Sequence, residues 1–172
     1  MTFTEFVEQN IDLVDNDDFQ ELFHQAGLRG FGLRLRELFD DLDIDYIHKW
    51  TYIPTHAYSY SLIKYINIPK NITAIAEYAF MQCQVEMVQA AYSSVTHIRQ
   101  KAFAYCDTLE EIWLPKTLKY IGARAFKGCN RLKKIVYEGT LDNWVTNVIK
   151  DANWKDDHVQ ILVQCLDGEI YV

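Results

Sequence analysis

Three stretches of this chain repeat one pattern at an interval of 23 residues. They read AIAEYAFMQC, HIRQKAFAYC and KYIGARAFKGC, and they end at Cys83, Cys106 and Cys129. Three further columns keep the same interval: Ile75, Ile98 and Ile121; Ala79, Ala102 and Ala125; Phe80, Phe103 and Phe126. Independent columns that share one period of about 20–50 residues are the signature of a solenoid, in which each repeat forms one coil.

A fourth, imperfect copy precedes these three. Ile66 lies 46 residues, or two periods, before Ile112. The segment IPTHAY, residues 53–58, leads this copy but runs one residue short relative to Ile75. A single coil holds too few apolar residues to close a core. We therefore expect the coils to stack about 4.8 Å apart, with equivalent side chains in vertical files.

Each coil is expected to contain one short strand. Leu109, Ile112 and Leu114 surround Trp113 in an alternating pattern, which predicts that the aliphatic side chains point inward and the indole outward. Pro115 should end the strand because it cannot donate a ladder hydrogen bond. The repeated alanine, phenylalanine and cysteine are then predicted to lie at a close-packed corner, in the interior and in the core, respectively.

Many of these columns together resemble one known family. LEEIWLPKTLKYIGARAFKGC, residues 109–129, resembles the BspA-type leucine-rich repeat, whose unit reads roughly L-xx-I-x-L-P-xx-L-xx-I-G-xx-A-F-xx-C. The segment IVYEGTLDNW, residues 135–144, is similar to the closing segment often found after the last such repeat. The resemblance covers about Ile53 to Trp144 and implies a leucine-rich-repeat solenoid.

One repeat, CQVEMVQAAYSSVTHI, departs from the family pattern. A strict period places Glu86, Gln89 and Tyr92 where the next repeat has Leu109, Ile112 and Pro115. The length of the repeat is preserved, so we expect the coil to survive, while the register and facing of its strand stay open.

The expected fold class is α+β. We predict a short solenoid of about three to four coils with a helical N-terminal cap and an α/β C-terminal cap. Residues 1–50 form the predicted acidic helical cap domain, residues 51–138 the repeats, and residues 139–172 a C-terminal cap of one helix plus a β-hairpin. Three apolar stripes at helical spacing predict the N-terminal helices: Phe3, Phe6, Val7 and Ile11; Phe19, Leu22, Phe23 and Ala26; Leu35, Leu38, Phe39 and Leu42.

The C-terminal cap is predicted from a capping residue and a turn. Thr140 can cap a helix that carries Leu141, Trp144, Val145 and Val148. Asp167 and Gly168 are typical of a two-residue hairpin turn. The strand before this turn is predicted from the alternation of Val159, Ile161, Val163 and Cys165, and EIYV forms the strand after it.

The net charge of −7 is unevenly distributed. Residues 1–46 hold 12 of the 24 acidic and three of the 17 basic residues, a net charge of −9, whereas Ile112 to Tyr137 contains seven bases and no acid. No apolar run approaches the roughly 18 residues that a membrane span needs. The start, MTFTEFVEQNID, lacks the basic and apolar regions of a secretory signal. We expect a cytoplasmic protein with no membrane partner.

No set of residues predicts catalysis. The chain has no C-x-x-C pair, H-E-x-x-H or G-x-S-x-G motif, and its five histidines are scattered. GLRGFGLR, residues 27–34, is interpreted as a helix-to-helix turn because it lacks a P-loop lysine. DDLDID, residues 40–45, lacks the spacing of a calcium loop. We therefore expect no enzyme activity, no catalytic residue, no metal site and no cofactor, and we expect the repeat cysteines to be buried structural thiols.

Two surfaces are candidates for binding. The first is the outward strand face, on which an exposed tryptophan would fit an interaction hot spot; a cap packed over Trp113 is the open alternative. Its predicted residues are Tyr65, Asn67, Glu111, Trp113, Lys134 and Val136. The second is a basic face of Lys116, Lys119, Arg124, Lys127, Arg131 and Lys133. Nucleic acid is disfavoured as a partner because the whole chain is acidic and no aromatic platform is interleaved with the bases.

The family resemblance implies a non-catalytic protein–protein interaction module. Such repeats occur in bacteria, protists and bacteriophages, which suggests a bacterial or phage-encoded protein that binds and modulates a host protein in the bacterial or infected host cell. Two alternatives stay open. One is a structural or assembly component of a virion or scaffold, whose solenoid ends or C-terminal strand self-associate. The other is an acidic nucleic-acid mimic formed by residues 1–46. We expect a monomer or weak self-association.

Overall fold

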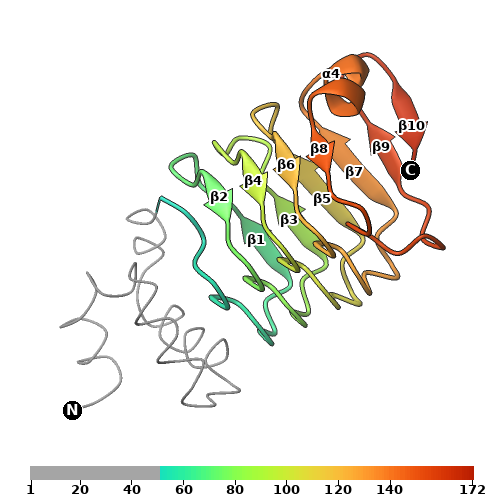
Figure 1. Cartoon of the computed structure of the whole chain (residues 1–172). Helices are drawn as coiled ribbons and strands as arrows, with labels where there is room; N and C mark the ends of the chain where they lie inside the picture. Colours follow the sequence, from blue (N-terminus) through green and yellow to red (C-terminus); the bar gives the residue numbers. More distant parts are fainter. Residues whose placement is uncertain (1–50) are drawn as a thin grey trace, which may run out of the picture.

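The computed structural model describes residues 51–172, which form a β-solenoid of about three turns (Figure 1). The predicted helical cap at residues 1–50, and with it the proposed acidic mimic at 1–46, lies outside the described residues. Two sheets run along the solenoid: one of six strands in the order β1-β3-β5-β7-β9-β10 and one of four in the order β2-β4-β6-β8. All neighbours are parallel except β9 and β10.

The strands are short, as expected for coils of 22 to 24 residues. The six-stranded sheet contains β1 (Tyr65–Asn67), β3 (Met87–Gln89), β5 (Glu111–Leu114), β7 (Lys134–Tyr137), β9 (Leu162–Gln164) and β10 (Glu169–Tyr171). The four-stranded sheet contains β2 (Ala74–Ile75), β4 (His97–Ile98), β6 (Tyr120–Ile121) and β8 (Ile149–Lys150). Helix in the described range is confined to α4 (Leu141–Thr146), so this part of the chain is mostly β.

The phenylalanine column stacks as the repeat predicts. The ring centroids of Phe80 and Phe103 are 4.9 Å apart and those of Phe103 and Phe126 are 5.3 Å apart, with nearly parallel planes. Tyr58 extends the stack by a further ring, 5.0 Å from Phe80, which confirms that the imperfect fourth copy is a coil. Trp154 closes the other end edge-on at 5.9 Å from Phe126.

The cysteine column is buried, as predicted. The Cys106 thiol donates to the carbonyl of Phe80 at 2.9 Å, and the Cys129 thiol donates to that of Phe103 at 3.0 Å. Each thiol therefore joins its own coil to the preceding one through a weak hydrogen bond. All four cysteines are free, including the partly buried Cys165.

The structure shows the register of β3, the strand of the repeat that departs from the family pattern. Val88, rather than Gln89, pairs with Ile112, so β3 is shifted by one residue from the strict 23-residue period. Compared with the next repeat, the chain has one residue fewer between Cys83 and Val85 and one residue more in the turn between β3 and β4. The reason is burial: Val88 is fully buried, whereas the strict alignment would place an amide in the apolar core.

Each coil turns around its aromatic ring with two residues at positive φ. These residues lie two positions before and two after the ring: Tyr78 and Gln82 around Phe80, and Lys101 and Tyr105 around Phe103. Such left-handed conformations are costly for residues other than glycine. The last coil uses Gly128 at φ 74, where a Cβ would lie 2.5 Å from the Tyr105 ring, so both conformation and space require a glycine.

The C-terminal elements close the solenoid largely as predicted. The Thr140 hydroxyl caps α4 by accepting from Asn143 N–H at 3.2 Å, and Trp144 on this helix is buried against Tyr137. The hairpin at the Asp167 turn forms β9 and β10. Three features were missed: the smaller sheet, which gives each coil a second short strand, its extension by β8, and the parallel pairing of β9 with β7.

Removing a ring from the centre of the stack should be strongly destabilising. Phe103 is fully buried between two parallel rings. We expect Phe103→Ala to lower the free energy of unfolding by about 3–5 kcal/mol, measured by urea denaturation with circular dichroism. Tyr92→Ala removes an aromatic side chain that is 79% exposed and should cost less than about 0.5 kcal/mol. Equal costs for the two variants would contradict a core built on the stack.

Candidate functional site

Strand pairing gathers the predicted strand-face residues into two rows. The first row runs Tyr65, Met87, Glu111 and Lys134 across β1, β3, β5 and β7. The second row runs Asn67, Gln89, Trp113 and Val136 across the same strands. The pairing therefore places all six predicted side chains in register on one face, in the two columns that the sequence predicted.

Met87 and Gln89 complete these rows and were missed by sequence reasoning. A strict period assigns their places to Val88 and Ala90, which the structure buries. The signal was present in the apolar pattern, because Val85 and Val88 keep the three-residue spacing of Leu109 and Ile112. If Val85 and Val88 are aligned with Leu109 and Ile112, Met87 aligns with the outward-facing Glu111.

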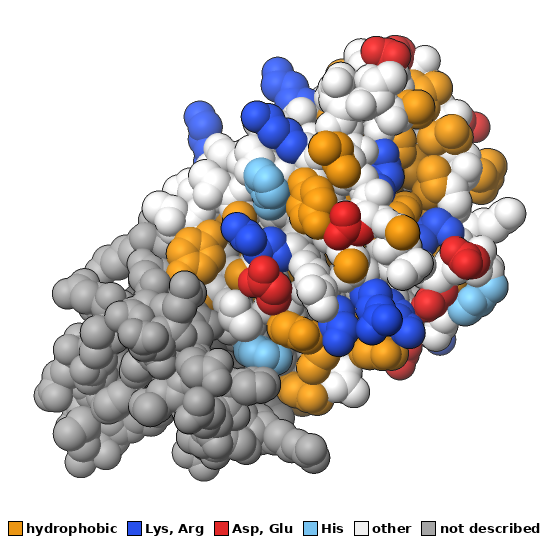
Figure 2. All heavy atoms as spheres, viewed as in Figure 1, with side chains coloured by type: hydrophobic (Ala, Val, Ile, Leu, Met, Phe, Trp, Pro, Cys, Tyr) orange, Lys and Arg blue, Asp and Glu red, His pale blue; other side chains and the backbone are white. Residues whose placement is uncertain are grey.

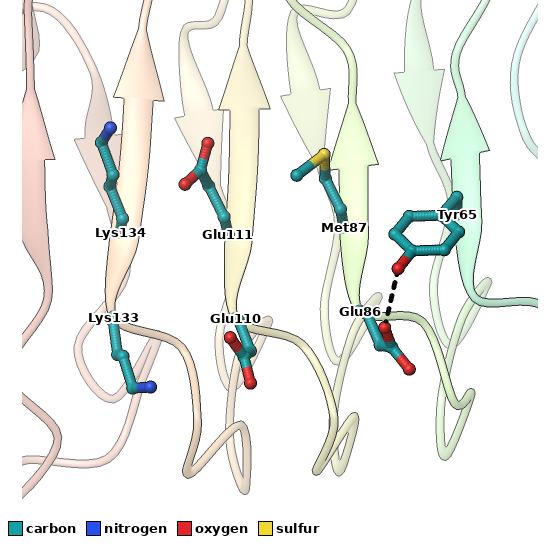
Figure 3. Close-up of a pocket in the computed structure, with 7 residues that line it drawn as sticks. All are labelled: Tyr65, Glu86, Met87, Glu110, Glu111, Lys133 and Lys134. Carbon is teal, nitrogen blue, oxygen red and sulfur yellow. Dashed lines mark hydrogen bonds between the residues drawn. The ribbon is translucent and has the colours of Figure 1, made fainter.

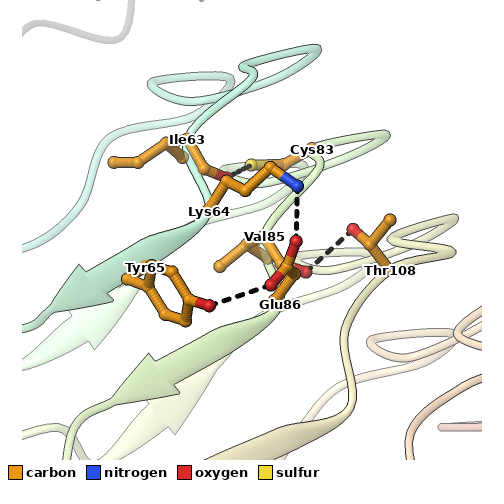
Figure 4. Close-up of polar contacts among 7 residues, drawn as sticks. All are labelled: Ile63, Lys64, Tyr65, Cys83, Val85, Glu86 and Thr108. Atoms are coloured by element: carbon orange, nitrogen blue, oxygen red, sulfur yellow. Dashed lines mark hydrogen bonds and ion pairs between the residues drawn. The ribbon is translucent and has the colours of Figure 1, made fainter.

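A polar cluster joins the first two coils below the strand face (Figure 4). Glu86 Oε1 accepts a hydrogen bond from Lys64 Nζ. Glu86 Oε2 accepts one from the Tyr65 hydroxyl at 3.0 Å. The hydrogen bond from Lys64, followed by that from Tyr65, lowers the pKa of Glu86, and the same contact raises the pKa of Lys64. Both groups are exposed to solvent, so the cluster orients side chains more than it stabilises the fold.

A shallow groove of about 410 Å³ crosses this end of the face (Figure 3). Its lining combines two aligned rows of charged side chains with one aromatic and one thioether side chain: Tyr65, Glu86, Met87, Glu110, Glu111, Lys133 and Lys134. Acidic groups just before β3 and at the start of β5 therefore stand beside basic groups at the start of β7. Glu110, Lys133 and Lys134 make no ion pair with any residue in the described range.

Trp113 is oriented by its neighbour on the same strand. The indole Nε1–H donates to Glu111 Oε1, which holds the ring along the face. The side chain is half-buried: it is neither an isolated projection nor part of the buried core. An aromatic side chain held in one orientation beside charged groups is typical of an interaction anchor.

The six residues of the predicted basic face are distributed around one turn of the solenoid. Lys116 and Lys119 lie in the turn between β5 and β6, Arg124 and Lys127 in the turn around Phe126, and Arg131 and Lys133 just before β7. The view of the four-stranded side likewise shows basic side chains at separate places, interspersed with acidic and apolar ones (Figure 2). Of the six, Lys133 alone lines the groove.

Two kinds of reactive group, metal-ligand clusters and activated thiols, can be compared with the side chains at residues 51–172. Within residues 51–172, no group of three or more His, Cys, Asp or Glu side chains could hold a metal ion. Burial raises the pKa of Cys83 to about 12, with a smaller contribution from Cys106, and burial also raises the pKa of Cys106. Thiols of this kind are poor nucleophiles, because the thiolate is the reactive form. None of the helices in this range is long and apolar enough to cross a membrane.

Thiol reactivity should separate Cys165 from the three repeat cysteines. In the native protein we expect one of the four thiols to react with Ellman's reagent, and the other three to react only after unfolding in guanidinium. Burial, with Asp167 nearby, raises the pKa of Cys165, so its reaction should accelerate as the pH becomes alkaline. Cys165→Ser should abolish the native reaction. Two or more fast thiols would show that the cysteine column is open.

The pKa of Glu86 should depend on its two partners. In Lys64→Met we expect the pKa of Glu86, followed by NMR titration of its carboxyl carbon, to rise toward its ordinary value. Because the pKa is lowered in the folded state, the small stabilisation is present above the unfolded-state pKa and lost as the pH falls through the folded-state value. Arg99→Met breaks the ion pair with Glu77 elsewhere and should leave Glu86 unchanged. No change in Lys64→Met would rule out the contact.

Comparisons with known proteins identify the repeat. The model of the BspA type leucine rich repeat region matches residues 39–155 in six copies, which is more than half of the chain. Among solved structures, the chain is similar to a leucine-rich repeat protein from Bacteroides ovatus, with 16% sequence identity and a TM-score of 0.25. That similarity covers 65% of this chain and 45% of the other, so this chain spans less than half of its length. The search of curated proteins gives no match.

Proposed function

Because the chain belongs to the BspA-type leucine-rich repeat family, we propose that it is a non-catalytic module that binds a protein partner through the outward face of the six-stranded sheet. Leucine-rich repeats generally mediate protein–protein interaction. The proposed contact residues are the six predicted on the strand face, together with Met87 and Gln89, which share their rows.

The observation that carries this proposal is the alignment, on one face, of an oriented tryptophan with charged side chains that make no ion pair with any residue from 51 to 172. Trp113 is held by Glu111, and Lys134 occupies the next strand beside Glu111. Interface hot spots combine a large aromatic side chain with charged neighbours that complement the partner. The strands beneath are fixed by parallel pairing on both sides, so binding would order little of the backbone.

The charged side chains on the strand face follow a fixed order from one strand to the next. Along the first row, the side chains change from acidic on β5 to basic on β7. The row before the strands repeats this order, with Glu110 followed by Lys133. A partner with the opposite order of charges would be accepted in one orientation and repelled in the reverse one.

We propose that the protein is made by a bacterium or a bacteriophage, acts in the cytoplasm, and modulates the host protein that it binds. This part rests on the family resemblance. Competition with the natural partners of the captured host protein would test it.

Changes at two face residues should abolish partner binding without unfolding the protein. We expect Trp113→Ala with Lys134→Glu to weaken binding at least about 100-fold, because two hot-spot losses of roughly 2 kcal/mol each would combine. The tagged full chain would capture partners from a lysate of the source cells, followed by mass spectrometry. The affinity for the purified captured protein would then be measured by calorimetry.

The matched control removes an aromatic side chain and reverses a charge away from the strands. Tyr92→Ala with Lys116→Glu should retain both the captured protein and its affinity, since both side chains are exposed in turns. The thermal midpoint of each double variant should stay close to that of the unaltered protein. Equal binding by the two double variants would overturn the strand face as the site.

A further inference from the structure

The last strand of the six-stranded sheet has an open edge. β10 pairs with β9 on one side, and no described strand lies on the other (Figure 1). All three of its residues are exposed, including Ile170 at 36% and Tyr171 at 67%. An edge strand of this kind is a template for pairing with another strand.

The hydrogen bonds of the hairpin show which backbone groups face the open side. Ile161 and Val172 exchange two backbone hydrogen bonds at 3.1 and 3.0 Å, and Cys165 N–H donates to Gly168 O at 2.8 Å. In an antiparallel pair, hydrogen-bonded positions alternate with non-hydrogen-bonded ones.

Ile170, which is paired with Val163, therefore uses its N–H and C=O within the hairpin. The backbone groups of Glu169 and Tyr171 point away from β9. The edge thus presents two donors and two acceptors to a further strand.

β10 is short and carries one charged side chain, but it lacks the other common protections of an edge strand. β10 contains no proline, no lysine and no bulge, and Glu169 is its only charged residue. The hairpin is also held in place, because the Asp167 carboxylate accepts from Leu141 N–H at 2.7 Å and Leu166 N–H donates to Gly139 O at 3.0 Å. The edge is preorganised for pairing.

We propose that β10 pairs antiparallel with β10 of a second copy, about a twofold axis through Ile170, so that two six-stranded sheets join into one. In this register, Glu169 of each copy lies opposite Tyr171 of the other. These are the residues with outward-pointing backbone groups, so the pairing forms four ladder hydrogen bonds. The two Ile170 side chains meet on the side of the sheet that carries the core.

The side chains are compatible with this symmetric register. No like charges face each other, because Glu169 meets Tyr171 of the second copy. The molecule already uses tyrosine–carboxylate contacts between neighbouring coils: Tyr65 with Glu86 at 3.0 Å and Tyr120 with Asp151 at 2.6 Å. A C2 interface of this kind closes on itself and stops at a dimer. The inference goes beyond the proposed function, since it uses none of the strand-face residues that bind the partner.

Sedimentation velocity of the full chain tests the proposal. We expect the weight-average mass to rise from 20.2 kDa toward twice that value as protein concentration increases. Ile170→Lys should abolish the dimer, because two lysines would face each other across the axis, and Ile170→Glu should do the same. An equimolar mixture of these two variants should restore the dimer, because opposite charges then meet at the axis.

A backbone variant tests the pairing itself. Tyr171→Pro removes an N–H that the hairpin does not use and should weaken the dimer at least about tenfold, because two symmetry-related hydrogen bonds are lost. Leu166→Lys changes a side chain that is 70% exposed in the hairpin turn and should leave the dimer unchanged. Circular dichroism would check that each variant is folded.

Two results would overturn the inference. One is a monomer at every concentration; the other is a dimer that persists in both Ile170→Lys and Tyr171→Pro, which would place the interface elsewhere. The strand-face double variant, Trp113→Ala with Lys134→Glu, should still dimerise. Failure of partner binding and failure of dimerisation can therefore be told apart.

Discussion

Hydrogen bonding between successive coils is the constraint on which the rest of this structure depends. Each coil is bonded to the next along both sheets and again at the turn around the aromatic ring, where Phe80 N–H donates to Ala102 O at 2.7 Å and Phe103 N–H donates to Ala125 O at 2.8 Å. The coils are therefore held near the spacing of paired strands. At this spacing, only identical or similar side chains in the same column can stack, which explains the phenylalanine, alanine and cysteine columns.

The regular part of the fold could be predicted because stacking imposes a visible period. The columns ending in Cys83, Cys106 and Cys129 identified the coils, and the imperfect copy that begins at Ile53 proved to be another. The shift of β3 could not be read from the period. Coil length is set at the aromatic turns, while the position of the strand within a coil is set by which apolar residue can be buried.

The same distinction applies to the candidate site. Tyr65, Glu111 and Lys134 were assigned to one row because their strands keep the apolar pattern, and the pairing agrees. Met87 was missed because its strand does not follow the strict period. The contacts of Glu86 with Lys64 and Tyr65 depend on side-chain conformations, and the pairing of β9 with β7 depends on how the chain returns after α4. Neither leaves a repeated signal in the sequence.

The left-handed residues around each ring have a consequence for how small this protein can be. Tyr78, Gln82, Lys101 and Tyr105 hold conformations that each cost about 1–2 kcal/mol relative to the right-handed alternative. They are retained because neighbouring coils fix the turn through hydrogen bonds on either side. A peptide of one coil has no such neighbours, so its turn would relax. The shape of each repeat is thus a property of the assembled array, and several consecutive repeats form the smallest autonomous unit.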